Sequence, residues 1–275
     1  MNWLESIVYA IISGMAEFLP VSSVAHQTIL LNLFGQTDIP AALNFTVHLG
    51  ALAAVYINCQ NHLAALSRTQ KILSIPKRRR KRQPDWELVA DLRLFRSASV
   101  LTVLMVFLQY FLSGLTGKLN YLAIFLLVNG IALYITGRIA IGNKNAGSMT
   151  GFDGILIGFT SGLGIIPGFS RLGLGATAGI VRGASPQNAL SWTLLISIPA
   201  LIALCVADIV LMFTGAISGF GFMMLLQCIV GAVFAFAGAH ISISLLRFMA
   251  VKVGFSWFSY YNWGLALFAF LLFMI

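Results

Sequence analysis

The chain has 275 residues, of which 59% are hydrophobic and only 9% are charged, and its net charge is +9. Soluble domains carry about 25% charged residues, so this composition excludes a soluble fold with a polar surface. Several apolar runs approach or exceed the roughly 20 residues needed to cross a bilayer. Because these runs are continuous rather than alternating, a β-barrel does not fit. We therefore predict an all-α polytopic membrane protein, with residues 1–275 forming a single integral membrane domain.

Most of the positive charge is local. Residues 77–82 have the sequence Lys-Arg-Arg-Arg-Lys-Arg, and further basic residues lie nearby. In a soluble protein such a run would suggest nucleic acid. Between apolar spans it is typical of a cytoplasmic loop that obeys the positive-inside rule and touches anionic lipid headgroups. We predict a basic cytoplasmic loop over approximately residues 60–96 and no nucleic-acid partner.

The chain begins with two short apolar segments. Met1 to Pro20 carries Glu17 and ends at a proline, and Val21 to Gly35 starts with Ser22 and Ser23. Serine before a helix favours an N-cap. Each segment is too short to span a bilayer alone, so together they predict a re-entrant hairpin or a broken helix. Such backbone is allowed at membrane depth only where it is buried or lines a cavity.

A second broken hairpin is predicted over Phe152 to Gly183. Pro167-Gly-Phe-Ser-Arg171 interrupts it, and a proline-glycine pair breaks a helix. Arg171 lies in a run that is otherwise almost free of charge, which is costly without an anion or a wet cavity. Glycines recur every four residues on both sides of the break, so backbones can approach closely along one face. These glycines are Gly154, Gly158, Gly162, Gly175, Gly179 and Gly183.

Six longer apolar runs predict membrane-spanning helices. They are Ala41–Cys59, Ser97–Leu115, Leu119–Ile139, Ala189–Thr214, Phe220–Ile243 and Val253–Ile275. The second and third are joined by a Gly-Lys turn.

The two broken hairpins form an internal repeat. Ser13-Gly-Met-Ala16 precedes Pro20, and Ser161-Gly-Leu-Gly164 precedes Pro167, so the offset is 161 − 13 = 148 residues. Each copy is a short apolar helix, a proline break, a serine and a second short helix. We predict repeat halves of approximately 1–115 and 119–275. Paired broken helices in two halves point to a site at the bilayer midplane, between the repeats.

Candidate reactive groups cluster at the first break. Ser22 and His26 are one helical turn apart, and Ser23 and His26 are also neighbours on one face. A serine beside a histidine or a glutamate, here Glu17, is the arrangement that activates a hydroxyl nucleophile. The alternative is that the serines cap a helix and the histidine packs between helices. Glu17 favours function, because an unpaired carboxylate in lipid costs several kcal/mol.

The second break supplies a candidate phosphate site. The guanidinium of Arg171 matches phosphate oxygens, and helix starts after Pro20 and Pro167 add backbone donors. Asn44 and His48, one turn apart, either line the same cavity or hydrogen-bond between helices.

Three other charged residues have less specific interpretations. Arg182 is either an interfacial residue or a phosphate support. We interpret Asp153 and Asp208 as helix-end residues.

Three motifs resemble one family. Glu17-Phe-Leu-Pro-Val-Ser-Ser23 followed by His26, Pro167-Gly-Phe-Ser-Arg171 and Asn44-Phe-Thr-Val-His-Leu-Gly50 are similar to signatures of the bacterial undecaprenyl-diphosphate phosphatase family, also called the bacitracin-resistance protein family. The order and length of the spans are similar over nearly the whole chain. The paired motifs are specific.

The resemblance implies an integral enzyme of the bacterial inner (plasma) membrane with an inverted-topology repeat and two re-entrant hairpins. Such an enzyme hydrolyses undecaprenyl diphosphate to the monophosphate, recycling the lipid carrier of cell-wall synthesis, at a site open to the periplasm. By position, Glu17 would be the acid/base or base-orienting carboxylate, Ser23 the nucleophile and His26 its partner or a proton donor. The substrate phosphate would be bound by Ser22, Ser170 and Arg171. Candidate cavity-lining residues are Ser13, Asn44, His48, Ser161 and Thr177.

The chain departs from the family pattern at four polar positions. Ser13 stands where the family usually has a second glutamate, Ser161 where a glutamine is common, and Leu172 and Gly175 replace a serine and a threonine. These changes remove hydrogen bonds that would stabilise charge developing near the phosphate. By this resemblance, the chain would be a divergent member of the family.

Two routes and one competing function stay open. Hydrolysis would use either Ser23, through a phosphoserine, or a water activated by Glu17. The alternative is a polyprenyl-phosphate transporter or flippase that has lost hydrolysis, since inverted repeats with broken midplane helices are typical of secondary transporters. A small-anion carrier is a third, weaker hypothesis. Convergence of Ser23, Glu17 and His26 on Arg171 would favour hydrolysis.

Partners follow from the same interpretation. We expect a polyprenyl diphosphate lipid and membrane lipids as ligands, with a homodimer as a candidate assembly. No carboxylate cluster suggests a dedicated metal cage. A divalent cation, Mg²⁺ or Ca²⁺, bridging Glu17 to the diphosphate is a further hypothesis.

Overall fold

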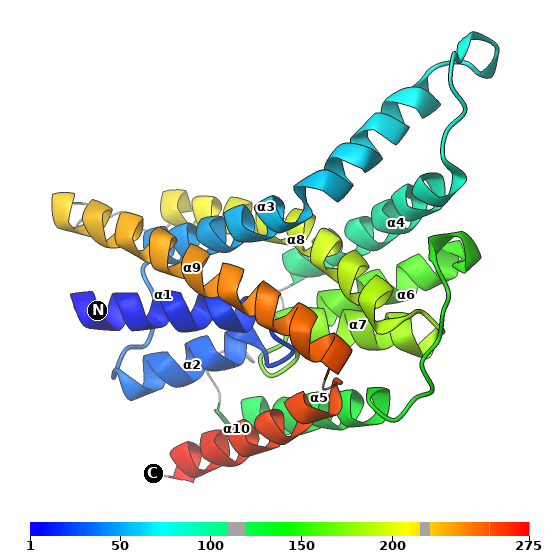
Figure 1. Ribbon diagram of the computed structural model, residues 1–275. Coiled ribbons are helices and arrows are strands. Elements are labelled where there is room, and N and C mark those ends of the chain that lie inside the picture. The colour runs from blue at the N-terminus through cyan, green and yellow to red at the C-terminus, as the bar shows by residue number, and fades with distance from the viewer. Residues whose placement is uncertain (109–118, 215–220, 253, 275) are drawn as a thin grey trace.

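The computed structural model describes residues 1–108, 119–214, 221–252 and 254–274, and within these ranges the chain is helical with no β-strand (Figure 1). The α-helices are α1 (Trp3–Glu17), α2 (Ser23–Leu33), α3 (Ala41–Ser74), α4 (Trp86–Leu108), α5 (Leu119–Thr136), α6 (Gly151–Gly162), α7 (Arg171–Val181), α8 (Pro186–Thr214), α9 (Phe222–Lys252) and α10 (Ser256–Met274). Short 3₁₀ helices are η1 (Lys77–Arg79), η3 (Ala146–Ser148) and η4 (Leu163–Ile165).

Five helices are long and apolar enough to cross a bilayer. They are Ala41–Ser74, Leu119–Thr136, Pro186–Thr214, Phe222–Met249 and Ser256–Met274. With the composition, they make this a multi-pass membrane protein. The predicted span Ser97–Leu115 corresponds in part to α4, and its end and the Gly-Lys turn lie outside the described residues. The first residues of the predicted spans Phe220–Ile243 and Val253–Ile275, and the last residue of the latter, lie outside them as well.

The basic region is more helical than a loop over 60–96 implies. Helix α3 has 34 residues and runs on to Ser74, about 51 Å at about 1.5 Å per residue. It continues past the apolar run because residues 60–74 are mostly good helix formers without glycine or proline. Asp85 starts α4 by accepting the backbone N–H of Glu87 at 2.9 Å. The end of α3 projects from the bundle in Figure 1, and the chain then returns to the bundle at the start of α4.

Both predicted helix breaks are present. Helix α1 ends at Glu17 and α2 begins at Ser23, while α6 and η4 end at Ile165 and α7 begins at Arg171. The two hairpins approach from opposite sides, and their broken ends meet in the middle of the bundle (Figure 1). The five residues at each break, 18–22 and 166–170, therefore lie at the centre of the molecule (Figure 1).

Each hairpin packs against helices from the other half of the chain. Helix α1 lies against α9, and α6 lies against α4. Gly14 and Gly158 permit these approaches, because a Cβ at either would overlap the backbone of Ala235 or Ala98 respectively. The remaining major pairs are α3 with α8 and α9, and α5 with α10. The glycine pattern thus marks real helix contacts.

One predicted charge assignment is confirmed at the start of the second hairpin. Asp153 lies in the first turn of α6, where it accepts the backbone N–H of Thr150 at 2.7 Å. Arg182, at the end of α7, forms an ion pair with Asp153. Arg182 therefore ties the two ends of this hairpin together, away from the cavity described below.

We expect Gly158→Ala to destabilise the protein, because its new Cβ would overlap the Ala98 carbonyl oxygen on α4. Overpacking of this kind costs about 1–3 kcal/mol. The matched control is Gly264→Ala on α10, where nothing lies within 4 Å of an added Cβ. The control should be neutral or slightly stabilising, because alanine favours a helix. Thermal unfolding midpoints in detergent check this, and equal midpoints for the two variants would contradict the packing.

Candidate functional site

The first hairpin break is tied to the second by a serine. Ser22 caps α2, its hydroxyl oxygen accepting the backbone N–H of Ala25 at 3.2 Å. The same oxygen accepts the backbone N–H of Gly168, also at 3.2 Å, from the second break. Ser22 has φ of 65°, a left-handed conformation that non-glycine residues rarely adopt. Its hydroxyl thus joins the two hairpins.

The matching serine of the second hairpin also caps a helix and contacts the break of the first hairpin. Ser170, 170 − 22 = 148 positions after Ser22, caps α7 by accepting the backbone N–H of Gly173 at 3.1 Å. Its hydroxyl donates to the carbonyl oxygen of Leu19, in the first break, at 3.2 Å. Both serines were predicted to bind phosphate. In the structure both are buried, neither is among the residues that line the cavity described below, and their hydroxyls hold the two hairpins together.

Two asparagines that the sequence analysis did not single out complete this junction. Asn262 on α10 donates to the carbonyl oxygen of Pro20 at 3.0 Å, and Asn129 on α5 donates to the Asn262 side chain at 2.9 Å. The Asn129 amide oxygen accepts the backbone N–H of Ser170 at 3.1 Å. Both side chains are fully buried. Their signal was an asparagine in the interior of each of two apolar runs.

A cavity of about 290 Å³ opens beside the junction. Its walls come from both hairpins and from α3, α4 and α8. It is lined by Glu17, Ser23, Val24, Gln27, Asn44, His48, Val106, Gly164, Ile165, Arg171, Leu204, Ala207, Asp208 and Leu211. Five of the residues predicted for the site, from three separate segments of sequence, therefore share one cavity.

An ion pair crosses the cavity between the hairpins. The Nη1 atom of Arg171, the first residue of α7, lies 2.7 Å from Oε1 of Glu17, the last residue of α1. Arg171 is 9% exposed and Glu17 is 8% exposed. Each charge compensates the other at a depth where an isolated charge is expensive. A guanidinium has five N–H donors, so Arg171 keeps further donors for a ligand.

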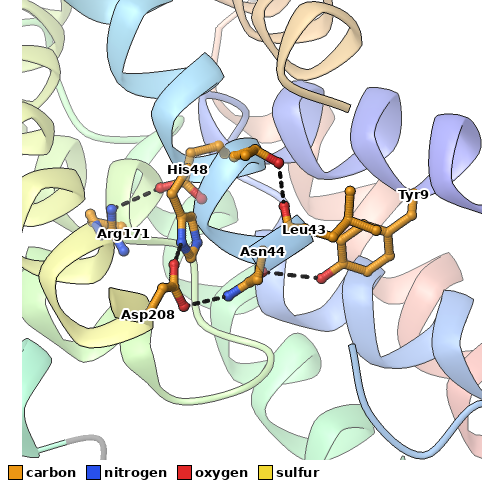
Figure 2. Close-up of polar contacts among 8 residues, drawn as sticks. Tyr9, Leu43, Asn44, His48, Arg171 and Asp208 are labelled. Atoms are coloured by element: carbon orange, nitrogen blue, oxygen red, sulfur yellow. Dashed lines mark hydrogen bonds and ion pairs between the residues drawn. The ribbon is translucent and has the colours of Figure 1, made fainter. Parts of the chain in front are cut away.

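A hydrogen-bonded histidine–aspartate pair lines the same cavity (Figure 2). The Nδ1 atom of His48 lies 2.6 Å from Oδ2 of Asp208, and Asn44 donates to Oδ1 of Asp208 at 2.9 Å. Tyr9 donates to the Asn44 amide oxygen at 3.5 Å. Asn44 and His48 thus line the cavity and also hydrogen-bond between helices, so both predicted alternatives hold.

The helix-end interpretation of Asp208 is wrong. Asp208 lies within α8, which continues to Thr214, and is 4% exposed. Its charge is tolerated at this depth because both carboxylate oxygens accept hydrogen bonds from α3. A carboxylate inside a 29-residue apolar helix was the signal that could have identified it.

Of the three predicted catalytic residues, the structure brings two together. Ser23 and Glu17 both line the cavity. His26 instead lies against a separate apolar groove. Its Nδ1 contacts the Ser22 carbonyl oxygen at 2.8 Å, and its Nε2 contacts the Tyr261 hydroxyl at 2.7 Å. These two bonds turn the ring away from the ion pair.

The remaining predicted lining residues, and the positions that depart from the family pattern, lie outside the cavity. Ser13 and Ser161 are buried among helices, and the Thr177 hydroxyl accepts from Thr136 at 2.9 Å. Leu172 is fully buried. An added Cβ at Gly175 would overlap the Ser161 hydroxyl, so this position is a helix contact. The departures therefore change helix packing rather than the cavity wall.

Fold and site together define a multi-pass helical membrane protein with a buried, charged cavity between two broken hairpins. The chain belongs to the family described as bacitracin resistance protein BacA, whose model matches residues 6–268. It is 29% identical to the undecaprenyl-diphosphatase of Carboxydothermus hydrogenoformans over 96% of this chain and 94% of that protein. It is 33% identical to the undecaprenyl-diphosphatase of Myxococcus xanthus, over 73% and 66% of the two chains. Undecaprenyl-diphosphatase 4 of Bacillus thuringiensis is 26% identical over 97% and 96%.

Ser22→Ala should destabilise the protein by about 1–3 kcal/mol, because it removes a helix cap and leaves the buried N–H of Gly168 without its acceptor. Ser22→Gly should cost less, because glycine adopts φ of 65° without strain. The measurement is the thermal midpoint in detergent of both variants beside Ser23→Ala. A midpoint for Ser22→Ala equal to that of Ser22→Gly would argue against the strained, cross-linking serine.

Proposed function

We propose that the protein hydrolyses undecaprenyl diphosphate, or a related polyprenyl diphosphate, to the monophosphate and phosphate. The observation that carries the proposal is the Glu17–Arg171 pair, set in a cavity between two helix breaks. The family and its curated relatives named undecaprenyl-diphosphatase support the same reaction.

The cavity can bind a diphosphate in two ways. Arg171 offers the donors that Glu17 does not use, in a fork that matches phosphate oxygens. Ser23 and Val24, the first two residues of α2, also line the cavity. The start of a helix carries partial positive charge and unpaired backbone donors, which favour an anion. These donors would stabilise the charge that grows on the terminal phosphate in the transition state.

The other wall suits a hydrocarbon chain. Val106 of α4 and Leu204, Ala207 and Leu211 of α8 form an apolar side of the same cavity. Leu204 and Leu211 are two helical turns apart, so they lie on one face of α8. A ligand that carries a diphosphate at one end and a prenyl chain at the other matches both walls.

The reacting oxygen comes from Ser23 or from a water molecule. In the first route the Ser23 oxygen bonds to the terminal phosphorus, the bridging P–O bond breaks, and water later hydrolyses the phosphoserine. In the second, water forms the bond to phosphorus directly. In both routes, the group that leaves the terminal phosphorus is the prenyl monophosphate. Glu17 orients Arg171, and its second carboxylate oxygen would be the group that holds a divalent cation, which would supply positive charge to offset that of the diphosphate. Loss of phosphate release on adding a chelator, restored by Mg²⁺ or Ca²⁺, is the measurement for that cation.

We also propose an inverted repeat in the bacterial inner membrane. The helix contacts between the two halves support the repeat. Helix α1 of the first half packs against α9 of the second, and α6 of the second half packs against α4 of the first. The opposed directions of the two hairpins in Figure 1 support it too. The basic residues 77–82 would then lie in the cytoplasm, opposite a periplasmic cavity. Re-entrance of both hairpins and a homodimer stay predictions.

Purified protein in detergent should release phosphate from undecaprenyl diphosphate, and farnesyl diphosphate would test the chain-length preference. We expect Arg171→Lys to lower kcat by about 10²-fold, because a point charge cannot replace the fork. Glu17→Gln should also be strongly impaired. The matched control is Arg182→Lys, whose arginine pairs with a buried aspartate outside the cavity and should keep nearly full activity.

The transporter hypothesis gives the opposite result. Suppose that wild-type protein binds the lipid, that this binding needs Arg171, and that no phosphate is released. This result would overturn the hydrolysis proposal and leave a polyprenyl-phosphate transporter or flippase as the function. Equal activity of Arg171→Lys and Arg182→Lys would remove Arg171 from the site.

A further inference from the structure

His48 and Asp208 form a buried, hydrogen-bonded pair that the proposed phosphate site does not use. His48 comes from α3 and Asp208 from α8, and both line the cavity that holds Arg171. Figure 2 shows the His48 ring and the Arg171 guanidinium on neighbouring walls. Buried pairs of this kind are costly, so a purely packing role is better served by apolar side chains.

The hydrogen bonds hold the His48 ring in one orientation and one tautomer. Asp208 accepts through Oδ2 from Nδ1 of His48 at 2.6 Å, while Oδ1 is held by Asn44 at 2.9 Å. A carboxylate that accepts from Nδ1 places the proton on that nitrogen. The other ring nitrogen, Nε2, then carries a lone pair and can accept a proton.

We propose that His48 is the general base of the reaction and that Asp208 is its positioning residue, an inference that rests on the proposed phosphatase function. As the attacking oxygen of water or of Ser23 bonds to the terminal phosphorus, its proton moves to Nε2 of His48. The bridging P–O bond breaks, and its electron pair leaves with the prenyl monophosphate. The imidazolium, stabilised by Asp208, then returns its proton to the released phosphate or to solvent.

The other histidines are less well placed for this step. Both ring nitrogens of His26 have partners, Ser22 and Tyr261, and its ring faces another groove. His62 pairs with Asp91 at 3.2 Å, further along α3 and outside the cavity.

The charged surroundings of His48 come from three helices. Asp208 on α8 contacts the His48 ring directly, and Glu17 on α1 and Arg171 on α7 line the same cavity. Tyr9 of α1 donates to Asn44, which in turn contacts Asp208. The titratable groups of α4 and α9 that contact α3 do so elsewhere on that helix. These are Asp91 at His62, Arg96 at Gln70, His240 and Arg247 at Asn58, and Cys228 at Thr46. On α8, Cys205 lies near Asp208.

The test measures kcat and KM for phosphate release across pH, in full-length wild-type protein and in His48→Ala, Asp208→Asn and the control His62→Ala. We expect His48→Ala to lower kcat by about 10²–10⁴-fold with little change in KM. This variant should lose the fall in kcat that the wild type shows at acidic pH. Added imidazole should restore part of its activity. Asp208→Asn should lower kcat, because an amide facing Nδ1 favours the wrong tautomer. His62→Ala should follow the wild type.

Two results would overturn the inference. One is a His48→Ala variant with wild-type kcat and pH profile. The other is a loss of activity that imidazole does not restore and that accompanies a lower thermal midpoint, since that is a structural role. Wild-type protein that releases no phosphate would overturn the proposed function first, and this inference with it, so the two failures are distinguishable.

Discussion

Two helix breaks in an apolar bundle leave backbone groups and charges that lipid cannot satisfy, and the rest of the structure depends on how they are paired. Glu17 and Arg171 end one broken helix and begin another, and their ion pair joins the hairpins on the cavity side. Behind it, Ser22 and Ser170 cap the following helices and reach across to the opposite break. Helices α5 and α10 contact this junction through the buried side chains of Asn129 and Asn262.

The same constraint explains why polar and charged groups gather in the cavity. A continuous helix pairs its own backbone groups, whereas a broken one presents a helix start inside the protein. Here α2 presents Ser23 to the cavity, and α7 presents Arg171. Long helices supply the remaining groups, since His48 and Asp208 meet only where α3 crosses α8. Under the proposed function, donors held in fixed positions would need no reorganisation as charge develops on the phosphate.

Local sequence signals predicted the elements well and the roles of individual side chains less well. Proline breaks and apolar runs identified both hairpins, and the charges Glu17 and Arg171 were recognised because lipid penalises them. Serines next to a break have two uses, and spacing alone cannot separate a cap that faces the partner hairpin from a nucleophile that faces the cavity. In the structure, Ser22 and Ser170 lie in the junction between the hairpins, whereas Ser23 lines the cavity. Asp208 and its contact with His48 depend on a helix crossing 160 residues apart in sequence.

The most direct test of the central claim is a double-mutant cycle on the Glu17–Arg171 pair. Thermal midpoints in detergent would be measured for Glu17→Gln, Arg171→Gln and the double variant. Each single change should be strongly destabilising because it leaves a buried charge unpaired, and the double variant should be no less stable than either, a coupling of at least about 1 kcal/mol. Additive losses would show that the two charges do not meet, and would contradict the junction from which the site is built.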